Sequence, residues 1–537
     1  MCYFFNTLFA NEQLMYLTSQ LKTTQPLNMP IIGEIISRSL KIRKRFSKKK
    51  DNDWNVQRKT LKKLLEKAQY TAFGKHYQFE KILSEAVDFP TVFKNTIPEH
   101  NYNSMHDQWW YRCLKSEADV TWPGKVKYFA LSSGTSESAS KHIPVTSDMI
   151  RSIKKVGLKQ FYSMTNFDIP PAAFTKGILM LGGTTSLMEK DDYYEGDMSG
   201  ISAKNMPKLF SNLLYKPGKK ISKSPNWEER IKLIVENAPK WNVGTLCGVP
   251  AWALIVLEEI VKKYNLKNIH EMWPNLSVYI HGGVAFEPYR EPLKQLMGKP
   301  ITYIETYMAS EGSFGFQSRP GVSGIQLELN AGIFFEFVPF NEENFTEDGE
   351  VRPNAQSKFI HEVEKGTDYA VMLSTCSGAW RYIIGDVVRF TSVRHNELVI
   401  VGRTKQFLSL CGEHMSVDNI NKAIDAIINE TGLSIGEFTV AGFPYENRFA
   451  HRWYIGCDNQ NVDKEQIKRI IDETLCRIND DYAVERQSAL KEVFIEILPK
   501  ERFIDYLKHM GKYGAMNKFP RVLKGTQLID WEEFLKK

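Results

Sequence analysis

The stretch YFALSSGTSESASKHIPV occupies residues 128–145 and joins two strand-like segments through a loop of small hydroxyl residues. The loop, residues 132–141, places several hydroxyl and backbone N–H donors around Gly134, and Lys141 adds a positive charge. Such a concave turn suits the binding of a polyphosphate. Because a Ser/Gly loop is more often only a loop, this stretch indicates a phosphate site only in combination with other segments.

On both sides of this stretch, the apolar pattern alternates between strand-like and helix-like periods. Upstream, a helical stretch is expected over residues 54–86, and loops are expected past Pro90. The apolar face of that helical stretch consists of Leu61, Leu64, Leu65 and Ala68. Downstream, the pattern predicts strands at 177–181, 277–280, 301–304 and 333–338, and helices at 149–161, 227–237 and 251–264. This alternation predicts a layered α/β domain.

A second, smaller unit begins near residue 403. Ser416 can cap a helix that Gly432 ends, because serine side chains accept from the first turn and glycine tolerates the left-handed conformation that follows a helix. Beyond this helix, the sequence predicts strands at 438–443 and 452–457, a helix at 467–478 and a strand at 493–498. We therefore expect a disordered extension, a large α/β domain and a smaller α+β domain, over residues 1–28, 29–402 and 403–537.

The composition is that of an ordinary globular protein: of 537 residues, 42% are apolar and 25% are charged. The net charge of +7 comes from residues 41–50, which hold seven basic residues and no acidic one. Charge runs are usually solvated, so we expect no nucleic-acid partner, with contact to anionic lipid or RNA as the alternative. The seven cysteines are scattered, and no apolar run approaches the ~20 residues of a membrane span. A cytoplasmic protein with reduced thiols and no transmembrane segment is expected.

Several common catalytic signatures are missing from the sequence. It contains no P-loop motif, no dinucleotide-binding glycine motif, no zinc-protease helix motif and no nucleophile elbow. The chemistry must therefore be sought in less familiar segments.

Two further segments carry a carboxylate beside aromatic or glycine residues. In YMASEG, residues 307–312, the Tyr307 ring can stack on a purine and Glu311 can bind Mg²⁺, which prefers oxygen ligands. In WRYIIGDVV, residues 380–388, a glycine precedes Asp386, and such a carboxylate can accept two ribose hydroxyls. Taken singly, a surface glutamate at a strand end and a β-turn aspartate explain these segments equally well.

Basic residues mark both ends of the expected small domain. GRTK occupies residues 402–405 and NKFPR occupies residues 517–521. A cation delivered by a second domain can stabilise charge on a phosphoryl or carboxylate oxygen. A lysine near a chain terminus is usually only solvated, so these segments also gain meaning only from the others.

Together, in this order and spacing, the four segments resemble the motifs of the GH3 family of acyl-acid-amide synthetases, a branch of the adenylate-forming enzymes related to acyl-CoA ligases and luciferases. The resemblance covers about residues 30–537. GVPAW at 248–252 and HGGVAF at 281–286 are similar to the acyl-pocket and adenine-side segments of that family. Two positions depart from its pattern, since Glu137 stands where many relatives have glycine and Trp380 replaces the usual tyrosine.

The resemblance implies an adenylate-forming fold with a mobile C-terminal domain. It also implies that Lys518 and Glu311 are catalytic, that Glu311 helps to place Mg²⁺, and that Lys405 is the hinge residue. The ATP-binding residues that it implies are Ser132, Ser133, Gly134, Thr135, Lys141, Thr306, Tyr307, Asp386 and Arg403.

The implied reaction uses ATP and Mg²⁺ to adenylate a small carboxylic acid, whose acyl group then passes to the amine of an amino acid. Two alternatives stay open. One is an enzyme that forms a thioester with a thiol such as coenzyme A, and the other is a nucleotide-binding protein without catalysis, which the charge of Glu137 makes conceivable. A monomer or weak homodimer is expected.

Overall fold

The computed structural model describes residues 52–85, 88–132, 141–283, 286–346, 349–353, 355–404, 407–433, 435–457, 459, 462–510 and 519–536. The expected extension at 1–28 and the basic segment at 41–50 lie outside these residues. The same is true of six residues singled out in the sequence, namely Ser133, Gly134, Thr135, Glu137, Lys405 and Lys518.

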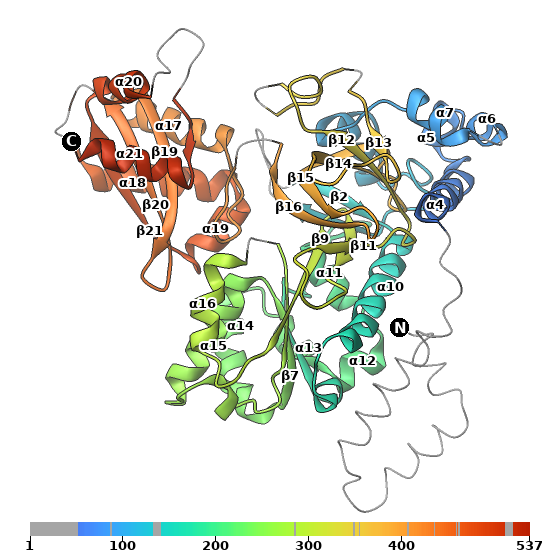
Figure 1. Ribbon diagram of the computed structural model, residues 1–537, viewed down its shortest axis with the longest axis horizontal. Coiled ribbons are helices and arrows are strands. Elements are labelled where there is room, and N and C mark those ends of the chain that lie inside the picture. Colours follow the sequence, from blue (N-terminus) through green and yellow to red (C-terminus); the bar gives the residue numbers. More distant parts are fainter. Residues whose placement is uncertain are drawn as a thin grey trace, which may run out of the picture.

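A large mixed sheet forms the centre of the molecule (Figure 1). Its strand order across the described residues is β13-β12-β14-β15-β16-β11-β10-β9-β8-β7-β3-β6. The strands are β3 (Gly177–Leu181), β6 (Tyr215–Lys216), β7 (Val243–Gly248), β8 (Val278–His281), β9 (Thr302–Ala309), β10 (Gly312–Phe316), β11 (Ile325–Leu327), β12 (Ile333–Pro339), β13 (Lys358–Phe359), β14 (Asp368–Thr375), β15 (Tyr382–Ser392) and β16 (Glu397–Arg403).

Strand β9 is the boundary between a parallel and an antiparallel half of this sheet. On one side, β9, β8, β7, β3 and β6 pair in parallel. On the other side, β9 pairs antiparallel with β10, and the remaining strands continue in that manner. The predicted strand at 177–181 is confirmed, whereas β9 runs five residues further than the predicted 301–304. Tyr307 therefore lies inside a strand and not beyond its end.

Helices cover both faces of the parallel half. Alternate residues of β8 point to opposite sides, because side chains of a strand alternate. Val278 packs in the cluster that contains Phe161 of α10 (Ser147–Ser163), whereas Tyr279 packs in the cluster of α14 (Trp227–Asn237) and α15 (Pro250–Lys263). The helix predicted at 227–237 is confirmed, and the Asn226 side chain caps it by accepting from the backbone of Glu229. Smaller elements here are η2 (Met164–Asn166), η3 (Pro171–Thr175), α11 (Met198–Lys204), α12 (Lys208–Leu213), α13 (Lys219–Ser222), η4 (Ala238–Lys240), η5 (Ile269–Glu271) and α16 (Glu287–Gln295).

The N-terminal helices pack against the antiparallel half. The expected helical stretch at 54–86 is broken into α4 (Asp53–Ala68), α5 (Ala72–His76) and α6 (Phe79–Ser84), because Thr71 starts a new helix by capping Gly74. The predicted apolar face of α4 is buried. The expectation of loops past Pro90 is wrong, since proline is tolerated in the first turn of a helix. The helices there are α7 (Phe89–Thr96), α8 (Tyr102–Met105), η1 (His106–Trp110) and α9 (Tyr111–Leu114).

A smaller sheet carries the Ser/Gly loop. Its order is β2-β1-β5-β4, formed by β1 (Tyr128–Ser132), β2 (Lys141–Val145), β4 (Met188–Glu189) and β5 (Tyr194–Gly196). Strands β1 and β2 are antiparallel, and Ser132 pairs directly with Lys141. The two ends of the loop are therefore fixed side by side.

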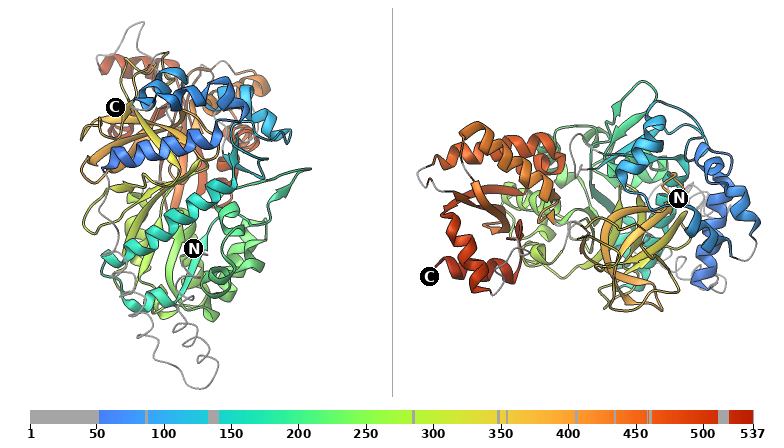
Figure 2. Two further views of the ribbon diagram at one scale, coloured as in Figure 1. Left: turned by 90° about the vertical axis from the view of Figure 1, so that its right-hand side faces the viewer. Right: turned by 90° about the horizontal axis from the view of Figure 1, so that it is seen from above.

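The C-terminal part has a sheet of its own, in the order β21-β20-β19-β22. The helix expected after Ser416 is present and ends before Gly432, whose φ is +70°. Seen from above, this unit and the N-terminal helices lie at opposite ends of the molecule (Figure 2). Its elements are β17 (Phe407–Leu408), β18 (Met415–Ser416), α17 (Val417–Thr431), β19 (Ile435–Tyr445), β20 (Arg448–Cys457), α18 (Lys464–Ile478), α19 (Asp480–Arg486), β21 (Leu490–Leu498), α20 (Lys500–His509), β22 (Val522–Leu523) and α21 (Thr526–Leu535).

None of the helices in the described part of the chain combines the length and apolar character needed to cross a bilayer.

Candidate active site

Three predicted site residues meet where the two halves of the large sheet join. Asp386 of β15 lies directly opposite Arg403 of β16, and Nη1 of Arg403 is 2.7 Å from Oδ1 of Asp386. The hydroxyl of Tyr307 on β9 donates to the other carboxylate oxygen at 2.6 Å. Because each oxygen of Asp386 has its own partner, the carboxylate is held in one orientation. Asp386 is thus part of a strand ladder and not of a strand-ending turn.

The contact between Tyr307 and Asp386 could not be predicted from the sequence. The ring of Tyr307 is buried and stands edge-on to Phe314, with centroids 4.8 Å apart. Burial, followed by the charge of Asp386, raises the pKa of Tyr307 well above its ordinary value of 10.0. The phenol therefore stays protonated at neutral pH and remains a donor to Asp386.

Gly385 allows the approach of these strands. Its φ is +87°, a left-handed conformation that favours glycine, and a Cβ there would lie 3.3 Å from Nη2 of Arg403. The backbone N–H of Thr404 donates to the carbonyl oxygen of Gly385 at 2.8 Å. Thr404, which precedes the expected hinge residue Lys405, is thereby anchored to the site.

Glu311 lies in the short turn between β9 and β10, close to the same cluster. Burial, and then the charge of Asp386, raises the pKa of Glu311, whereas Lys141 and Arg403 act in the opposite direction. Burial and the Glu311 charge also raise the pKa of Tyr382 well above its ordinary range. Glu311 is therefore a half-buried carboxylate whose ionised form would gain from an additional cation.

The base of the Ser/Gly loop lies beside this turn. The Ser310 hydroxyl donates to the carbonyl oxygen of Leu131 at 3.5 Å, one residue before the loop starts at Ser132. At the other end of the loop, the Lys141 ammonium lies 5.5 Å from the centroid of the Tyr102 ring and interacts electrostatically with Glu311. The ends of the predicted phosphate loop and the two predicted carboxylates thus converge in one region.

The segment at 281–286 approaches β9 from the parallel half. A Cβ at Gly282 would lie 2.2 Å from the carbonyl oxygen of Thr306, so only glycine permits this contact. The ring of His281 stacks on Phe286 with centroids 4.0 Å apart. Burial, followed by the charge of Arg290, lowers the pKa of His281 to about 4, which keeps this imidazole neutral at neutral pH. The predicted adenine-side segment and Thr306 are therefore in direct contact.

Models of three domains of one protein family match the chain. The GH3 family N-terminal domain matches residues 42–187 and 153–301, the central domain matches 327–403, and the C-terminal domain matches 418–527. The chain belongs to the GH3 family.

Curated GH3 relatives match at low identity. The indole-3-acetic acid-amido synthetase GH3.4 of Arabidopsis thaliana is 25% identical over 182 residues, which are 32% of this chain and 30% of that protein. The jasmonoyl–L-amino acid synthetase JAR6 of Nicotiana attenuata is 22% identical over 437 residues, covering 69% of this chain and 73% of the relative. In the first two relatives the match spans only 30% and 33% of their length.

Solved structures show the same fold. The GH3.15 acyl acid amido synthetase in complex with 2,4-DB superposes with a TM-score of 0.55 at 16% identity, covering 95% of this chain and 97% of that one. A 2-hydroxyisobutyryl-CoA ligase in its thioesterification state gives a TM-score of 0.55 at 12% identity, covering 88% and 89%. The large α/β region followed by a smaller C-terminal unit is therefore the adenylate-forming fold.

One arginine of this GH3 chain has a role that the sequence did not reveal. Arg381, five residues before Asp386, is buried at a φ of +41°, and its side chain bonds to groups on β12 and near the N-terminal helices. Its Nε donates to Glu336 of β12 at 3.1 Å, and one Nη1 bond of 2.6 Å reaches the carbonyl oxygen of Ile97. Nη1 also lies 3.0 Å from a carboxylate oxygen of Glu99. The sequence did contain one signal for this pairing, because an arginine inside an apolar run is expected to need an acidic partner from elsewhere in the chain.

The predicted catalytic lysine, Lys518, lies outside the described residues, but its neighbour is fixed. Phe519 is buried against Phe503 and Trp531 in the core of the C-terminal unit, with ring centroids 4.9 and 5.0 Å away. That unit also contacts the large region, since the Tyr289 hydroxyl donates to the carbonyl oxygen of Leu410 at 2.9 Å and Arg448 bonds Glu258 at 2.5 Å.

Proposed function

We propose that the protein is an ATP-dependent ligase that joins a carboxylic acid to the amine of an amino acid. The observation that carries the proposal is the convergence of Tyr307, Asp386 and Arg403 with Glu311 beside the ends of the Ser/Gly loop, in a GH3 chain. A loop of N–H and hydroxyl donors next to oriented carboxylates suits a nucleoside triphosphate.

The proposed reaction has two steps. A carboxylate oxygen of the acid attacks the α-phosphorus of ATP, the new P–O bond forms, and pyrophosphate leaves. The amine then attacks the acyl carbonyl, AMP leaves with the acyl oxygen that it had gained, and the amine loses a proton. Orientation and charge stabilisation are the main contributions that the protein supplies to such transfers.

We assign the residues as follows. Ser132, with Ser133, Gly134 and Thr135 of the loop, binds the phosphates, and Lys141 supplies charge. Asp386 accepts the ribose hydroxyls, because a carboxylate has about four lone-pair sites and its two present partners occupy only some of them. Thr306 lines the adenine side, whereas Tyr307, whose ring is buried, contributes through the bond of its hydroxyl to Asp386, which Arg403 also orients.

A magnesium ion fits this arrangement through Glu311. In the described part of the chain, no group of three or more His, Cys, Asp or Glu residues could hold a metal by itself. Mg²⁺ commonly binds proteins through one or two carboxylates together with substrate phosphates. Bound there, the cation would supply charge neutralisation on the phosphates, and Glu311 would hold its position.

The C-terminal unit is assigned a delivery role. We propose a large domain over 29–402 and a small mobile domain over 403–537 that turns about Lys405 and brings Lys518 to the α-phosphoryl and carboxylate oxygens. The enzyme would act in the cytoplasm as a monomer or weak homodimer, with small-molecule substrates and no nucleic acid. Outside residues 41–50, basic and acidic residues are equal in number, which supports the absence of a nucleic-acid partner.

The test is a carboxylate library supplied with ATP and Mg²⁺, read by pyrophosphate release and by mass spectrometry of products formed with a panel of amino acids. An amide product with release of AMP supports the proposal. Pyrophosphate exchange that no carboxylate stimulates, despite tight ATP binding, would replace it with the non-catalytic alternative.

A thioester-forming enzyme is the second candidate, favoured by the likeness to the 2-hydroxyisobutyryl-CoA ligase fold. The same assay with coenzyme A in place of the amino acids separates the two. A thioester without any amide across the panel would favour this candidate.

A further inference from the structure

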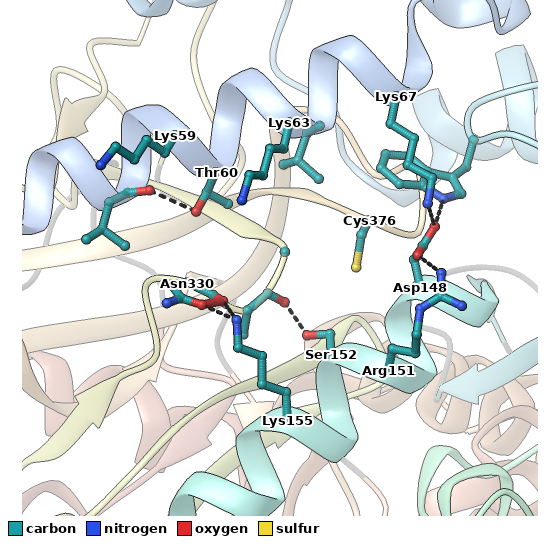
Figure 3. A pocket seen from close by; sticks show the side chains of 15 residues that line it. Lys59, Thr60, Lys63, Lys67, Asp148, Arg151, Ser152, Lys155, Asn330 and Cys376 are labelled. Atoms are coloured by element: carbon teal, nitrogen blue, oxygen red, sulfur yellow. Dashed lines mark hydrogen bonds and ion pairs between the residues drawn. The ribbon is translucent and has the colours of Figure 1, made fainter. Parts of the chain in front are cut away.

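A cavity of about 490 Å³ lies between α4 and α10 (Figure 3). None of its lining residues belongs to the assigned nucleotide set. Its volume falls within the range of small-molecule pockets. The function proposed above leaves this cavity unexplained.

The lining of the cavity is strongly basic. Five cationic side chains face one acidic side chain, that of Asp148, among the described lining residues. The cationic residues are Lys59, Lys63 and Lys67 of α4 and Arg151 and Lys155 of α10. Figure 3 shows the two helices on opposite sides, with the Lys63 amine directed into the space between them.

Sequence spacing produces the two basic walls. Residues four apart lie on one face of a helix, so the three lysines of α4 form one row and Arg151 and Lys155 form another. Like charges at this spacing repel each other and disfavour the helix. A concave surface lined by one sign of charge concentrates ions of the opposite sign.

Asp148 does not neutralise this surface. Its carboxylate already binds Lys67 and Arg151, and it accepts the indole N–H of Trp122 at 2.9 Å. Lys155 bonds the Asn330 side chain and carbonyl oxygen, which carry no formal charge. Partial desolvation, followed by the charge of Lys159, lowers the pKa of Lys155, although the charge of Glu328, which is paired with Lys159, acts in the opposite direction.

We propose that this cavity is a second anion site, which binds a small molecule carrying at least two phosphate groups. The two basic walls face each other, so that one phosphate meets the α4 lysines and another meets Arg151 and Lys155. A small polyphosphate is favoured over an extended surface partner, because the five exposed cations surround a hollow of small-molecule size and not a flat face.

The test uses the full-length protein and inositol hexakisphosphate as the probe, because its ring presents phosphates in several directions. Isothermal titration calorimetry should show binding of the hexakisphosphate. This binding should persist in a sodium sulfate buffer whose ionic strength matches that of the standard buffer. Inositol, which carries no phosphate, should not bind. The double variant Lys63→Gln/Lys155→Gln should weaken binding at least ~10-fold, whereas Lys232→Gln, an exposed lysine of α14, should change it less than ~2-fold.

The nucleotide site provides a second control. Asp386→Asn should leave hexakisphosphate binding unchanged while ATP binding falls. Absence of binding, equal loss in Lys232→Gln, or loss in Asp386→Asn would each overturn the proposal. Recruitment of the protein to phosphatidylserine vesicles through Lys63 and Lys155, without binding of the soluble probe, would instead identify a membrane surface.

Discussion

Two arginine–carboxylate clusters stand at either end of one short segment, WRYIIGD, yet they differ in burial. Arg381 pairs with Glu336 at side-chain exposures of 3% and 1%, and its guanidinium also reaches carbonyl oxygens of the N-terminal helices. Arg403 pairs with Asp386 at 35% and 11% exposure, beside the ends of the Ser/Gly loop. The first cluster fastens the α7 region to the sheet, whereas the second orients the buried carboxylate of Asp386. The same chemistry therefore supports the fold in one place and the proposed function in the other.

Removal of Arg381 should break the structural cluster. Arg381→Ala leaves Glu336 buried without its partner, and we expect a loss of about 3–5 kcal/mol in the free energy of unfolding. Arg403→Ala should cost less, because the Arg403 side chain is 35% exposed and the Tyr307 hydroxyl still donates to the buried Asp386 carboxylate. Urea unfolding of both variants measures the difference. Arg389→Ala, which breaks a more exposed pair between β15 and Asp368 of β14, is the control and should change neither stability nor activity appreciably.

Lys518 tests whether the functional cluster works with a charge from the C-terminal unit. Lys518→Ala should slow adenylation at least ~10²-fold, or about 2.7 kcal/mol, because it removes charge stabilisation in the first step. The reaction of preformed acyl-adenylate with amine should be nearly unchanged. Lys508→Ala, at an exposed lysine of α20, should affect neither step. Equal losses in both steps would contradict the assignment.

The hydroxyl of Tyr307 is a finer probe of the same cluster. Tyr307→Phe removes the 2.6 Å bond to Asp386. Hydrogen bonds to charged groups contribute about 1.5–3 kcal/mol, so kcat/KM for ATP should fall at least ~10-fold. Tyr194→Phe removes an exposed bond to Glu189 and should leave kcat/KM unchanged. A Tyr307→Phe enzyme with wild-type kinetics would remove this hydroxyl from the proposed site.

The protonation of Glu311 gives the mildest test. Because its pKa in the folded protein is raised above the ordinary 4.5, activity that needs the ionised form should decline as pH falls through that raised value. A raised pKa also means that the folded state holds this proton more tightly than the unfolded state, so ionisation costs stability as pH rises. Glu311→Gln should thus be at least as stable at pH 7 and lose the acid limb of the pH–rate profile. If Glu311→Gln were less stable than the wild type at pH 7, the inferred direction of the Glu311 pKa shift would be contradicted.

Local signals predicted much of the fold. The helix at 227–237 was delimited by its own periodicity, and the strand at 177–181 by its continuous apolar run. Strand β9 was predicted too short, because the polar residues near Tyr307 interrupt the apolar run that marked its start. The helix ends after Ala68 because a capping threonine, Thr71, starts a new one. The helical periodicity of the apolar residues continues across this break and therefore did not reveal it.

The motifs named candidate residues that the structure brings together, but they did not predict the geometry of the contacts. Motif order indicated Tyr307, Asp386 and Arg403, but the register that places Asp386 opposite Arg403 depends on bulges in β15 and β16. The partner of Arg381 lies 45 residues away in sequence, and only the folded sheet brings Glu336 to it. Pairings of this kind follow from tertiary packing, which no single segment encodes.

Strand β9 lies between the two halves of the sheet. The number of its residues is therefore constrained more strongly than their identity. A substitution within it changes one side chain. An inserted or deleted residue would turn every later side chain of the strand to the opposite face, and the phenol of Tyr307 would then point away from Asp386. Variation in this strand should accordingly occur by replacement, while gain or loss of residues is confined to the loops on either side.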